Sequence, residues 1–561
     1  MGSDPTGASG AIRRQPWLGL FILALCLSAA LLIALRANIG FFLDDWGLVI
    51  YREGGPTDWL LPHNEHIIVL PAALYKLSLA VFGMTAFPLH MIAVALFLTS
   101  VVLLFFWLRP LIGDPTAVLG CAVVLFLGAA AADLIWAFQI GYFGSVAGGL
   151  GALLLLRRGN SGDSVWACLL LVLALLFSSL AIPFALGAAV WLLFPNGPRP
   201  EWNGFFRRSW VFLVPAGVYV IWWLGWGHLA ENSMSVHNAV RDPLYVLSAI
   251  GYAASVLVGA FPIRAITESF AWALPGLLIT AGLGYLLHRR GRVPPEFLVG
   301  AAIGVSFWVL SGLNFIPGRE FVSSRYQYPS VVMLLMILGG AFAGYRPAPR
   351  TVRVIAAVAI FAIVLNAATL VFAFHDRYKK YEQKNLISFS AFDLARRTVS
   401  PDFEVGAGVD DSARVDAASY FKAIDRYGSP ALSEAQAEEA SDENRDRLDQ
   451  LLVLGLPVQP VPATRVIPIR DRCRELAANS EASGKIRIDP GLSWISAEKD
   501  VLIRLNRFGT GRGAAAWSAS AGKPIGYRIP RDNSDLPWHI GFQGAGRVTV
   551  CPARADSQSL R

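Results

Sequence analysis

Two adjacent carboxylates, Asp44 and Asp45, open the polar part of the segment FFLDDWGLVIYREGGPTDWLLPHNEHIIVLP at residues 41–71. They follow an apolar run at 17–37, at the depth where a lipid bilayer gives way to water. A carboxylate there is unfavourable unless it faces a polar cavity, a cation or a substrate. A carboxylate held in place can also act as a general base. The pair therefore indicates a functional site, and the alternative is a helix that simply ends in water.

Adjacent aspartates can divide this work between them. We expect Asp45 to act as the base, or Asp44 if the loop is turned the other way. The second carboxylate would then orient the acceptor, bind a divalent cation or hold a backbone amide.

Three more polar residues, His63, Glu65 and His66, lie in the second half of the loop, PHNEHIIVLP. Side chains three apart can meet on a helical turn. Imidazoles with a carboxylate suit a transition metal, whereas oxygen ligands alone suit Mg²⁺ or Ca²⁺. A divalent ion (Mg²⁺, Mn²⁺ or Ca²⁺) is therefore a possible cofactor, with Asp45, His63 and His66 as candidate ligands. A polar patch that hydrogen-bonds the acceptor sugar is the simpler interpretation.

A later segment, GREFVSSRYQYPS at 318–330, places an arginine and a tyrosine on the same outer side. Arg325 stands just before the next apolar run, at the depth of lipid headgroups. Its guanidinium can hold a leaving phosphate through two parallel hydrogen bonds. Tyr326 is a second candidate for substrate binding. The alternatives are simple headgroup contact for the arginine and an interfacial aromatic belt for the tyrosine.

A very short outer turn, WAFQIGYF at 136–143, adds two further candidates. Gln139 and Tyr142 can reach into a cavity from there, or merely satisfy the backbone of the turn. We include both among the residues expected to bind substrate.

The composition describes an integral membrane protein. Of the 561 residues, 55% are hydrophobic and 16% are charged, and the mean hydropathy is +0.49. The formal net charge of +8 comes from arginines in short clusters between apolar runs, not from one basic face. We therefore expect a lipid bilayer as partner and no nucleic acid.

The apolar runs predict about eleven transmembrane helices. With the N-terminus in the cytoplasm, the arginine clusters fall in inside loops, and the aspartate loop and the C-terminal region lie outside. A further run at 244–261 would break this alternation if it crossed the bilayer, so we interpret it as a re-entrant or surface-lying helix. The predicted spans are 17–37, 88–108, 115–134, 140–156, 164–180, 182–194, 209–227, 270–287, 296–314, 328–344 and 353–374.

Composition divides the chain into four parts. Residues 1–15 are small and polar and are expected to form a disordered cytoplasmic N-terminus. The membrane domain covers 16–375 and includes a first outer loop at 38–87. Residues 376–460 indicate charged helices in an extracytoplasmic linker region. From 461 to 561, period-two alternation between turn residues predicts a small extracytoplasmic β-sandwich, which would bind a ligand, shape access to the site or serve as a stabilising cap.

Two of the five cysteines, Cys473 and Cys551, lie in the C-terminal region, and the others fall inside predicted spans. The two can pair outside the membrane, where disulfides persist. Such a bond would close a loop of roughly eighty residues and add about 4 kcal/mol of stability in the chain-entropy model. Two free thiols are the alternative.

The first apolar helix with its DDW loop, together with the segment carrying Arg325 and Tyr326, resembles the GT-C glycosyltransferases. That superfamily includes protein O-mannosyltransferases, lipid A aminoarabinose transferases and mycobacterial arabinofuranosyltransferases. The resemblance extends to the whole architecture, with an external C-terminal domain, but at residue level to these two segments alone. It implies a multi-span enzyme that takes a sugar from a polyprenyl phosphate, with an acidic residue of the first loop as base or metal contact.

We therefore predict a glycosyltransferase of the inner or plasma membrane. Its partners would be a polyprenyl-phosphate-linked sugar donor and a cell-envelope glycan, lipid or protein as acceptor. One alternative is a lipid or polysaccharide transporter or flippase, whose acidic residues would instead lie near the bilayer midplane on interrupted helices. A nonenzymatic envelope-assembly factor on the same scaffold is the other.

Overall fold

The computed structural model describes residues 16–52, 55–160, 162–230, 233–261, 270–405, 415–456, 458–478, 485–510 and 516–555. The segment 1–15, expected to be disordered, lies outside these ranges. The chain forms two compact units. The membrane unit comprises the chain up to Gly40, Arg52–Val81 and Ala86–Tyr378, and the C-terminal unit comprises Phe41–Tyr51, Phe82–Thr85 and the chain from Lys379 onward.

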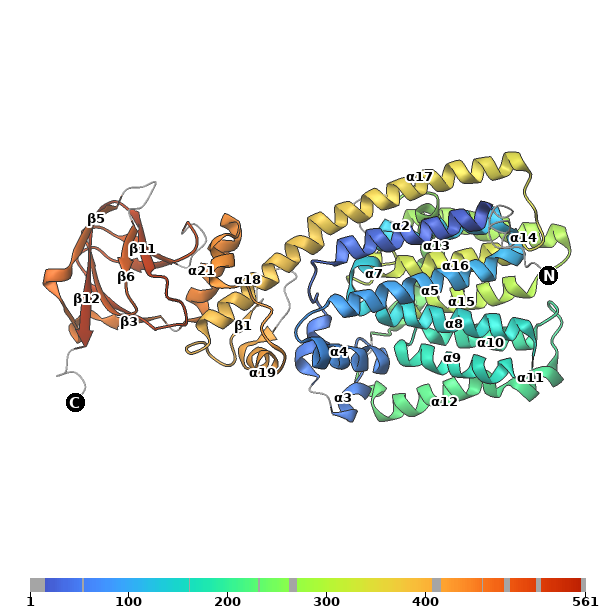
Figure 1. Cartoon of the computed structure of the whole chain (residues 1–561), viewed down its shortest axis with the longest axis horizontal. Helices are drawn as coiled ribbons and strands as arrows, with labels where there is room; N and C mark the ends of the chain where they lie inside the picture. The colour runs from blue at the N-terminus through green and yellow to red at the C-terminus, as the bar shows by residue number, and fades with distance from the viewer. Residues whose placement is uncertain are drawn as a thin grey trace, which may run out of the picture. The chain divides into compact units, whose positions relative to one another are not determined.

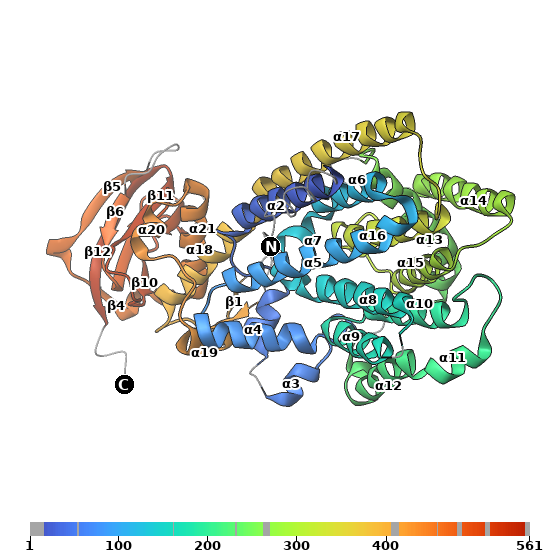
Figure 2. The same cartoon turned by 45° about the vertical axis from the view of Figure 1, so that its right-hand side comes forward.

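The membrane unit is a bundle of helices that lie side by side (Figure 1, Figure 2). Neighbours along the chain pack against each other, for example α8 against α9 and α15 against α16. The helices are α2 (Pro16–Arg36), α3 (Pro56–Leu60), α4 (Val69–Phe82), α5 (Phe87–Ile112), α6 (Asp114–Leu125), α7 (Ala131–Ile135), α8 (Ile140–Arg158), α9 (Asp163–Phe177), α10 (Ala181–Leu193), α11 (Trp202–Arg208), α12 (Trp210–Gly225), α13 (Val236–Leu257), α14 (Ala273–Arg290), α15 (Pro295–Leu313), α16 (Gln327–Ala341) and α17 (Pro349–Ala373).

Each of the eleven apolar runs contains a helix, but eleven membrane spans are not confirmed. Within the described residues, six helices are long and apolar enough to cross a membrane, or seven if the bent pair α11 and α12 is one span. The chain is thus a multi-pass membrane protein. The shorter helices fall short for a geometric reason: α9 has 15 residues and α10 has 13. At about 1.5 Å per residue neither reaches the thickness of roughly 30 Å of a hydrocarbon core.

Two parts of the membrane unit differ from a simple series of spans. Most of the apolar run at 244–261, which was interpreted as re-entrant or surface-lying, belongs to α13. This helix is continuous and packs against α14, α15 and α16. The segment expected as a first outer loop, 38–87, contains the additional helices α3 and α4. The sequence of α4, VLPAALYKLSLAVF, is mostly apolar, and its Tyr75 and Leu79 are buried. The polar residues that suggested a loop lie before this helix.

A buried arginine holds the end of α2, just before the aspartate pair. Arg36 is 1% exposed, and its Nε donates to the carbonyl of Leu134 at 2.6 Å. Its Nη1 and Nη2 donate to the carbonyls of His90 and Asp133, both at 3.2 Å. A buried guanidinium requires such partners. The contacts join α2 to α5 and α7 and so determine where the chain leaves the first helix.

The C-terminal unit combines helices with two antiparallel sheets. One sheet has the strand order β3-β10-β7-β12-β4, with β5 also paired to β12, and the other has the order β6-β11-β8-β9. The elements are α18 (Lys379–Ala395), α19 (Ala417–Tyr427), α20 (Glu434–Glu438), α21 (Asp442–Gly455), β1 (Glu404–Val405), β2 (Val415–Asp416), β3 (Gln459–Pro462), β4 (Val466–Pro468), β5 (Arg474–Ala478), β6 (Lys485–Ile488), β7 (Gly491–Ala497), β8 (Val501–Asn506), β9 (Ala516–Ala519), β10 (Ile525–Ile529), β11 (Trp538–Gly544) and β12 (Gly546–Ala555).

One hydrophobic core joins the two sheets and the helices. Alternate residues of the strands point inward, such as Ile495 of β7 and Ile503 of β8, which is the pattern expected of a β-sandwich. The same core includes Ile387 of α18 and Leu452 of α21. The predicted division between a helical linker and a β-sandwich, at residue 460, therefore falls inside one core.

A buried carboxylate fastens α21 to the sandwich. Asp449 is fully buried and accepts hydrogen bonds from the backbone N–H groups of Arg507 at 3.0 Å, Phe508 at 3.0 Å and Gly509 at 2.8 Å. Three amides that would otherwise lack partners are thereby satisfied. Helices and strands are thus coupled by polar contacts as well as by the core.

Cys473 and Cys551 form a disulfide across a sequence separation of 78 residues, so the structure favours pairing over two free thiols. Replacing both by serine is expected to lower the free energy of unfolding of the C-terminal unit by about 4 kcal/mol, because the unfolded chain regains loop entropy. Thermal unfolding followed by tryptophan fluorescence measures this, and a reducing agent should destabilise the wild type similarly. Cys26→Ser, at an exposed free thiol, is the control. Equal unfolding midpoints for wild type and double variant under oxidising conditions would contradict the expectation.

Candidate active site

The aspartate pair lies in a tight turn of the C-terminal unit. From Asp45 onward, three successive backbone N–H groups bond to the carbonyl three residues earlier. Leu43 enters the turn with a φ of +42°, in the left-handed region that residues other than glycine seldom adopt. Such strain persists only where neighbouring structure holds it. Here Trp46 packs edge-to-face on Phe41 with ring centroids 5.3 Å apart, and against Phe389 of α18 at 4.5 Å.

The two carboxylates have different surroundings. Asp45 is fully buried, and its Oδ2 accepts a hydrogen bond from the N–H of Phe42 at 2.7 Å. That contact is typical of the acidic third residue of a capping box, which reaches back to the first amide of a helical turn. Asp44 is half-buried. Holding a backbone amide, one of the roles considered for the pair, therefore falls to Asp45, while Asp44 is the carboxylate that remains partly accessible.

The histidines of the first loop meet in a hairpin turn, so the expected helical turn is wrong. His63 and His66 exchange two backbone hydrogen bonds, of 3.0 and 2.9 Å. The residues between them, Asn64 and Glu65, have φ values of +46° and +70°. Positive φ at both central positions is characteristic of a two-residue hairpin turn, and for glutamate it is unusual. The turn brings the two histidines together, as expected, but by a different backbone geometry.

Glu65 is held at the tip of this turn by contacts from distant parts of the membrane unit. Its Oε1 accepts from Nη1 of Arg319 at 3.3 Å and from the hydroxyl of Ser233 at 3.2 Å. The pairing with Glu65 places Arg319 beside the histidine turn.

Aromatic rings and a second arginine complete the surroundings of the histidines. The ring of His63 lies 4.8 Å from that of Phe138, and the ring of His66 lies 6.3 Å from that of Tyr142. Tyr142 is in electrostatic range of Arg319, Arg325 and Tyr326. We call this group (His63, Glu65, His66, Tyr142, Arg319, Arg325 and Tyr326) the histidine–arginine cluster.

His66 is neutral in this cluster at physiological pH. Burial, together with the smaller effect of the positive charges of His63, Arg319 and Arg325, lowers its pKa from 6.5 to about 4. Among the described residues, its Nδ1 has no hydrogen-bond partner. The imidazole can therefore donate or accept a hydrogen bond without carrying charge.

This lowered pKa predicts a pH dependence of stability. A base whose pKa is lower in the folded state contributes fully above about 6.5 and loses that contribution as the pH falls toward 4, because the unfolded chain binds the proton first. The melting temperature of the wild type should therefore fall more steeply over this window than that of His66→Gln. His228→Gln, at an exposed histidine, should follow the wild type. Parallel profiles for wild type and His66→Gln would show that the pKa is not lowered.

Arg325 projects from a short 3-10 turn, Ser324–Tyr326, that leads into α16. The hydroxyl of Ser324 donates to the carbonyl of Ala129 at 2.8 Å and accepts from the N–H of Ala132 at 3.0 Å. Nη2 of Arg325 donates to the carbonyl of Gly318 at 2.9 Å, and its guanidinium lies 5.4 Å from the ring centroid of Tyr326. These contacts hold the arginine in position before any ligand binds.

Two supporting residues were not identified from the sequence. Gln327 is buried and donates to the carbonyl of Phe321 at 2.6 Å, which closes the loop that carries Arg325. Asp133 is fully buried, and its Oδ2 accepts from the N–H of Tyr328 at 3.4 Å. A single acidic residue in the apolar run 115–134 was a usable indication of this position, since an ionisable residue in a span is a functional candidate.

Gln139 lies in the same region of the membrane unit but is almost wholly enclosed. It is 2% exposed, and among the described residues its Oε1 has no hydrogen-bond partner. Burying a carbonyl oxygen without a donor is unfavourable. The atom is therefore available to a bound ligand or water, which keeps Gln139 among the candidates.

The candidate metal ligands do not come together as a binding site. No group of three His, Cys, Asp or Glu side chains able to hold a metal ion occurs within the residues that the structure describes. Asp45, His63 and His66 accordingly do not form such a group. A cation does not enter the chemistry proposed below.

No family model matches this chain, and no curated protein matches it. A solved glycosyltransferase structure is similar to it. The cryo-EM structure of the arabinofuranosyltransferase AftD from mycobacteria aligns at 11% identity with a TM-score of 0.35. The alignment covers 96% of this chain and 61% of AftD, so the chain spans about three fifths of that protein's length. A likeness at this level assigns no function, so function rests on the residues described above.

Proposed function

We propose that this chain is a membrane glycosyltransferase that moves a sugar from a polyprenyl-phosphate donor to a cell-envelope glycan, lipid or protein. The observation that carries the proposal is the histidine–arginine cluster. In it, two guanidinium groups, a carboxylate and a neutral imidazole gather from segments more than 250 residues apart in sequence, as the Glu65–Arg319 contact shows. Ionisable groups gathered in a membrane protein are costly unless they serve a function.

Arg325 is proposed to bind the donor phosphate. As the bond between the anomeric carbon and the phosphate oxygen breaks, that oxygen keeps the electron pair and negative charge grows on the phosphate. A positioned guanidinium stabilises this charge more in the transition state than in the ground state. Neutral His66 and the amide of Gln139 would hydrogen-bond sugar hydroxyl groups.

Asp44 is proposed to act as the base. The acceptor hydroxyl oxygen forms the new bond to the anomeric carbon, and its proton passes to the carboxylate. We prefer Asp44 to Asp45 for this step because Asp45 is fully buried and already accepts the Phe42 amide. The disulfide between Cys473 and Cys551 supports an oxidising, extracytoplasmic compartment for the C-terminal unit, and hence an outer-face reaction.

Lipid mass spectrometry tests this function directly. Wild type, Asp44→Asn, Asp45→Asn and Arg325→Ala are purified after gentle extraction from the native membrane, and their bound lipids are compared. A polyprenyl-phosphate sugar that accumulates on Asp44→Asn and is lost from Arg325→Ala would support the proposal, and its mass would identify the sugar. Folded samples without any polyprenyl species would contradict it and favour transport or an assembly role.

A further inference from the structure

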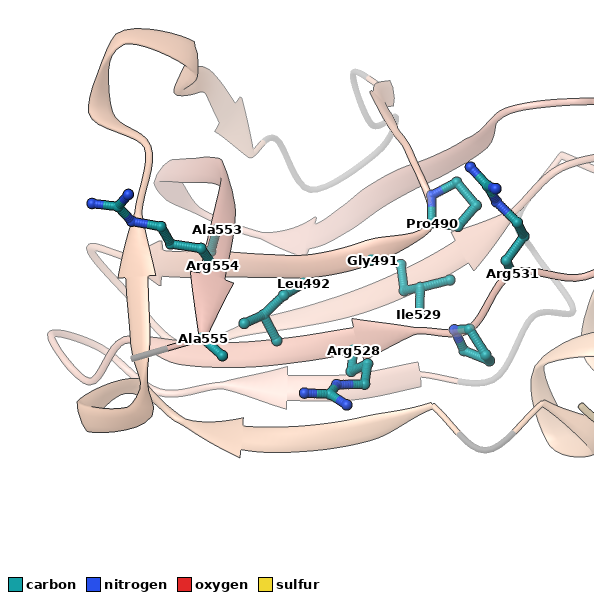
Figure 3. A pocket seen from close by; sticks show the side chains of 10 residues that line it. Pro490, Gly491, Leu492, Arg528, Ile529, Arg531, Ala553, Arg554 and Ala555 are labelled. Carbon is teal, nitrogen blue, oxygen red and sulfur yellow. The ribbon is translucent and has the colours of Figure 1, made fainter. Parts of the chain in front are cut away.

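A hollow of about 430 Å³ lies at one end of the six-stranded sheet, where β7 begins and β10 and β12 end (Figure 3). The strand register brings its floor together. Leu492 of β7 pairs with Arg528 of β10 on one side and with Ala553 of β12 on the other. Directly paired residues point to the same face of an antiparallel sheet. The three therefore form a row across the sheet, with an apolar side chain between an arginine and a small residue.

The charge of this hollow is of one sign. Three exposed arginines line it, Arg528, Arg531 and Arg554. None of them takes part in an ion pair within the described part of the chain, and Asp532, the carboxylate next to Arg531, is bonded to Arg507 at 2.9 Å. The remaining lining residues carry no charge: Pro490, Gly491, Leu492, Ile529, Pro530, Ala553 and Ala555.

Some exposed arginines elsewhere in the C-terminal unit have carboxylate partners. Arg396 pairs with Asp425, and Arg547 pairs with Glu498 at 3.1 Å. Three neighbouring arginines without such partners raise the local positive potential, which an anionic ligand would relieve. Arginine is also the residue whose planar fork best matches carboxylate and phosphate oxygens.

The arrangement of the arginines indicates the shape of the ligand. Figure 3 shows the three guanidinium groups at separate places around the hollow, with Leu492 between them. The three groups do not converge on one point. A single small anion would need converging donors. Separate cations suit a chain with repeated negative groups. The lining lacks aromatic residues on which neutral sugars could stack, and a hollow does not match a flat bilayer surface.

We propose that the C-terminal unit binds an anionic polysaccharide in this hollow, with carboxylate or phosphate groups of successive sugars bound by Arg528, Arg531 and Arg554. The proposal goes beyond the transfer reaction, because it gives the C-terminal unit a ligand of its own. Binding would hold a long acceptor or product chain to the protein between transfer events.

The test is a binding measurement on the full-length protein in a neutral detergent. The probe is a fluorescently labelled oligogalacturonate, and its fully methyl-esterified form has the same backbone without charge. We expect the wild type to bind the charged probe, and to bind it more weakly as ionic strength rises. The variant with Arg528, Arg531 and Arg554 all changed to glutamine should bind at least about tenfold more weakly, since three charge-assisted contacts are lost together.

A matched variant separates this site from general basicity. Arg470, Arg472 and Arg487 are exposed arginines of the same unit outside the hollow, and changing these three to glutamine removes the same charge. That variant should bind within about twofold of the wild type, as expected for screened surface charges. The proposal is overturned if both triple variants bind equally, if the methyl ester binds as well as the acid, or if only phosphatidylglycerol vesicles bind. Lipid occupancy by mass spectrometry should be unchanged in the hollow variant, so failure here is distinguishable from failure of the transfer function.

Discussion

Asp44→Asn is expected to lower the rate of sugar transfer by about 10²- to 10⁴-fold, the usual contribution of a general base. Asparagine has nearly the same shape but cannot take the acceptor's proton. Folding should change little, because Asp44 is half-buried and the amide of Phe42 is bonded to Asp45. The measurement is transfer from a labelled polyprenyl-phosphate sugar in reconstituted membranes, together with the melting temperature.

Variants of Asp45 provide the control for this assignment. Asp45→Asn keeps an oxygen that can accept the N–H of Phe42, so it should fold and should retain more activity than Asp44→Asn. Asp45→Ala leaves that buried N–H without an acceptor and should destabilise the turn by about 1–3 kcal/mol. If Asp45→Asn loses transfer while Asp44→Asn retains it, the two aspartates have the opposite roles.

Arg325→Ala is expected to lower transfer by about 10²- to 10³-fold, equivalent to about 2.7–4 kcal/mol of transition-state stabilisation. The guanidinium is already positioned by the carbonyl of Gly318 and the ring of Tyr326, so it meets the growing phosphate charge without rearrangement. Arg325→Lys should recover only part of the rate, because an ammonium group lacks the planar pair of donors. Steady-state transfer at saturating donor measures both variants.

Two further variants distinguish catalysis from general charge effects. Arg289→Ala removes a cation from the last turn of α14 and should leave transfer unchanged. Glu65→Gln weakens the contact with Arg319 at 3.3 Å and so disturbs the geometry of donor binding. It should therefore change KM for the donor more than kcat. A full transfer rate in Arg325→Ala would exclude the phosphate-binding role.

Much of the fold follows from local pattern. Apolar runs of the right length are helices because each buries its own backbone polar groups, and period-two alternation from residue 461 onward forms the strands of two sheets. Compartment and number made the pairing of Cys473 with Cys551 possible but left two free thiols open, and the structure contains the disulfide. The predicted number of eleven spans is not confirmed, since six or seven of the described helices meet the criterion of length and apolar composition for a span.

The candidate site was only partly predictable. Residue types alone made Asp44, Asp45, Glu65 and Arg325 candidates, because charged groups are unfavourable beside apolar runs. They did not reveal the hairpin turn of His63 and His66. Its central residues, Asn64 and Glu65, have positive φ values, which the sequence would normally indicate by a glycine.

Long-range contacts account for the rest. The ion pair between Glu65 and Arg319 joins residues 254 positions apart, and the hydrogen bond that holds Ser324 to Ala129 joins residues 195 apart. Burial separates the two aspartates, which are chemically identical in the sequence, into one that supports a turn and one that stays accessible. Sequence spacing records which residues are near each other along the chain, whereas burial and electrostatic environment depend on neighbours that only the folded packing supplies.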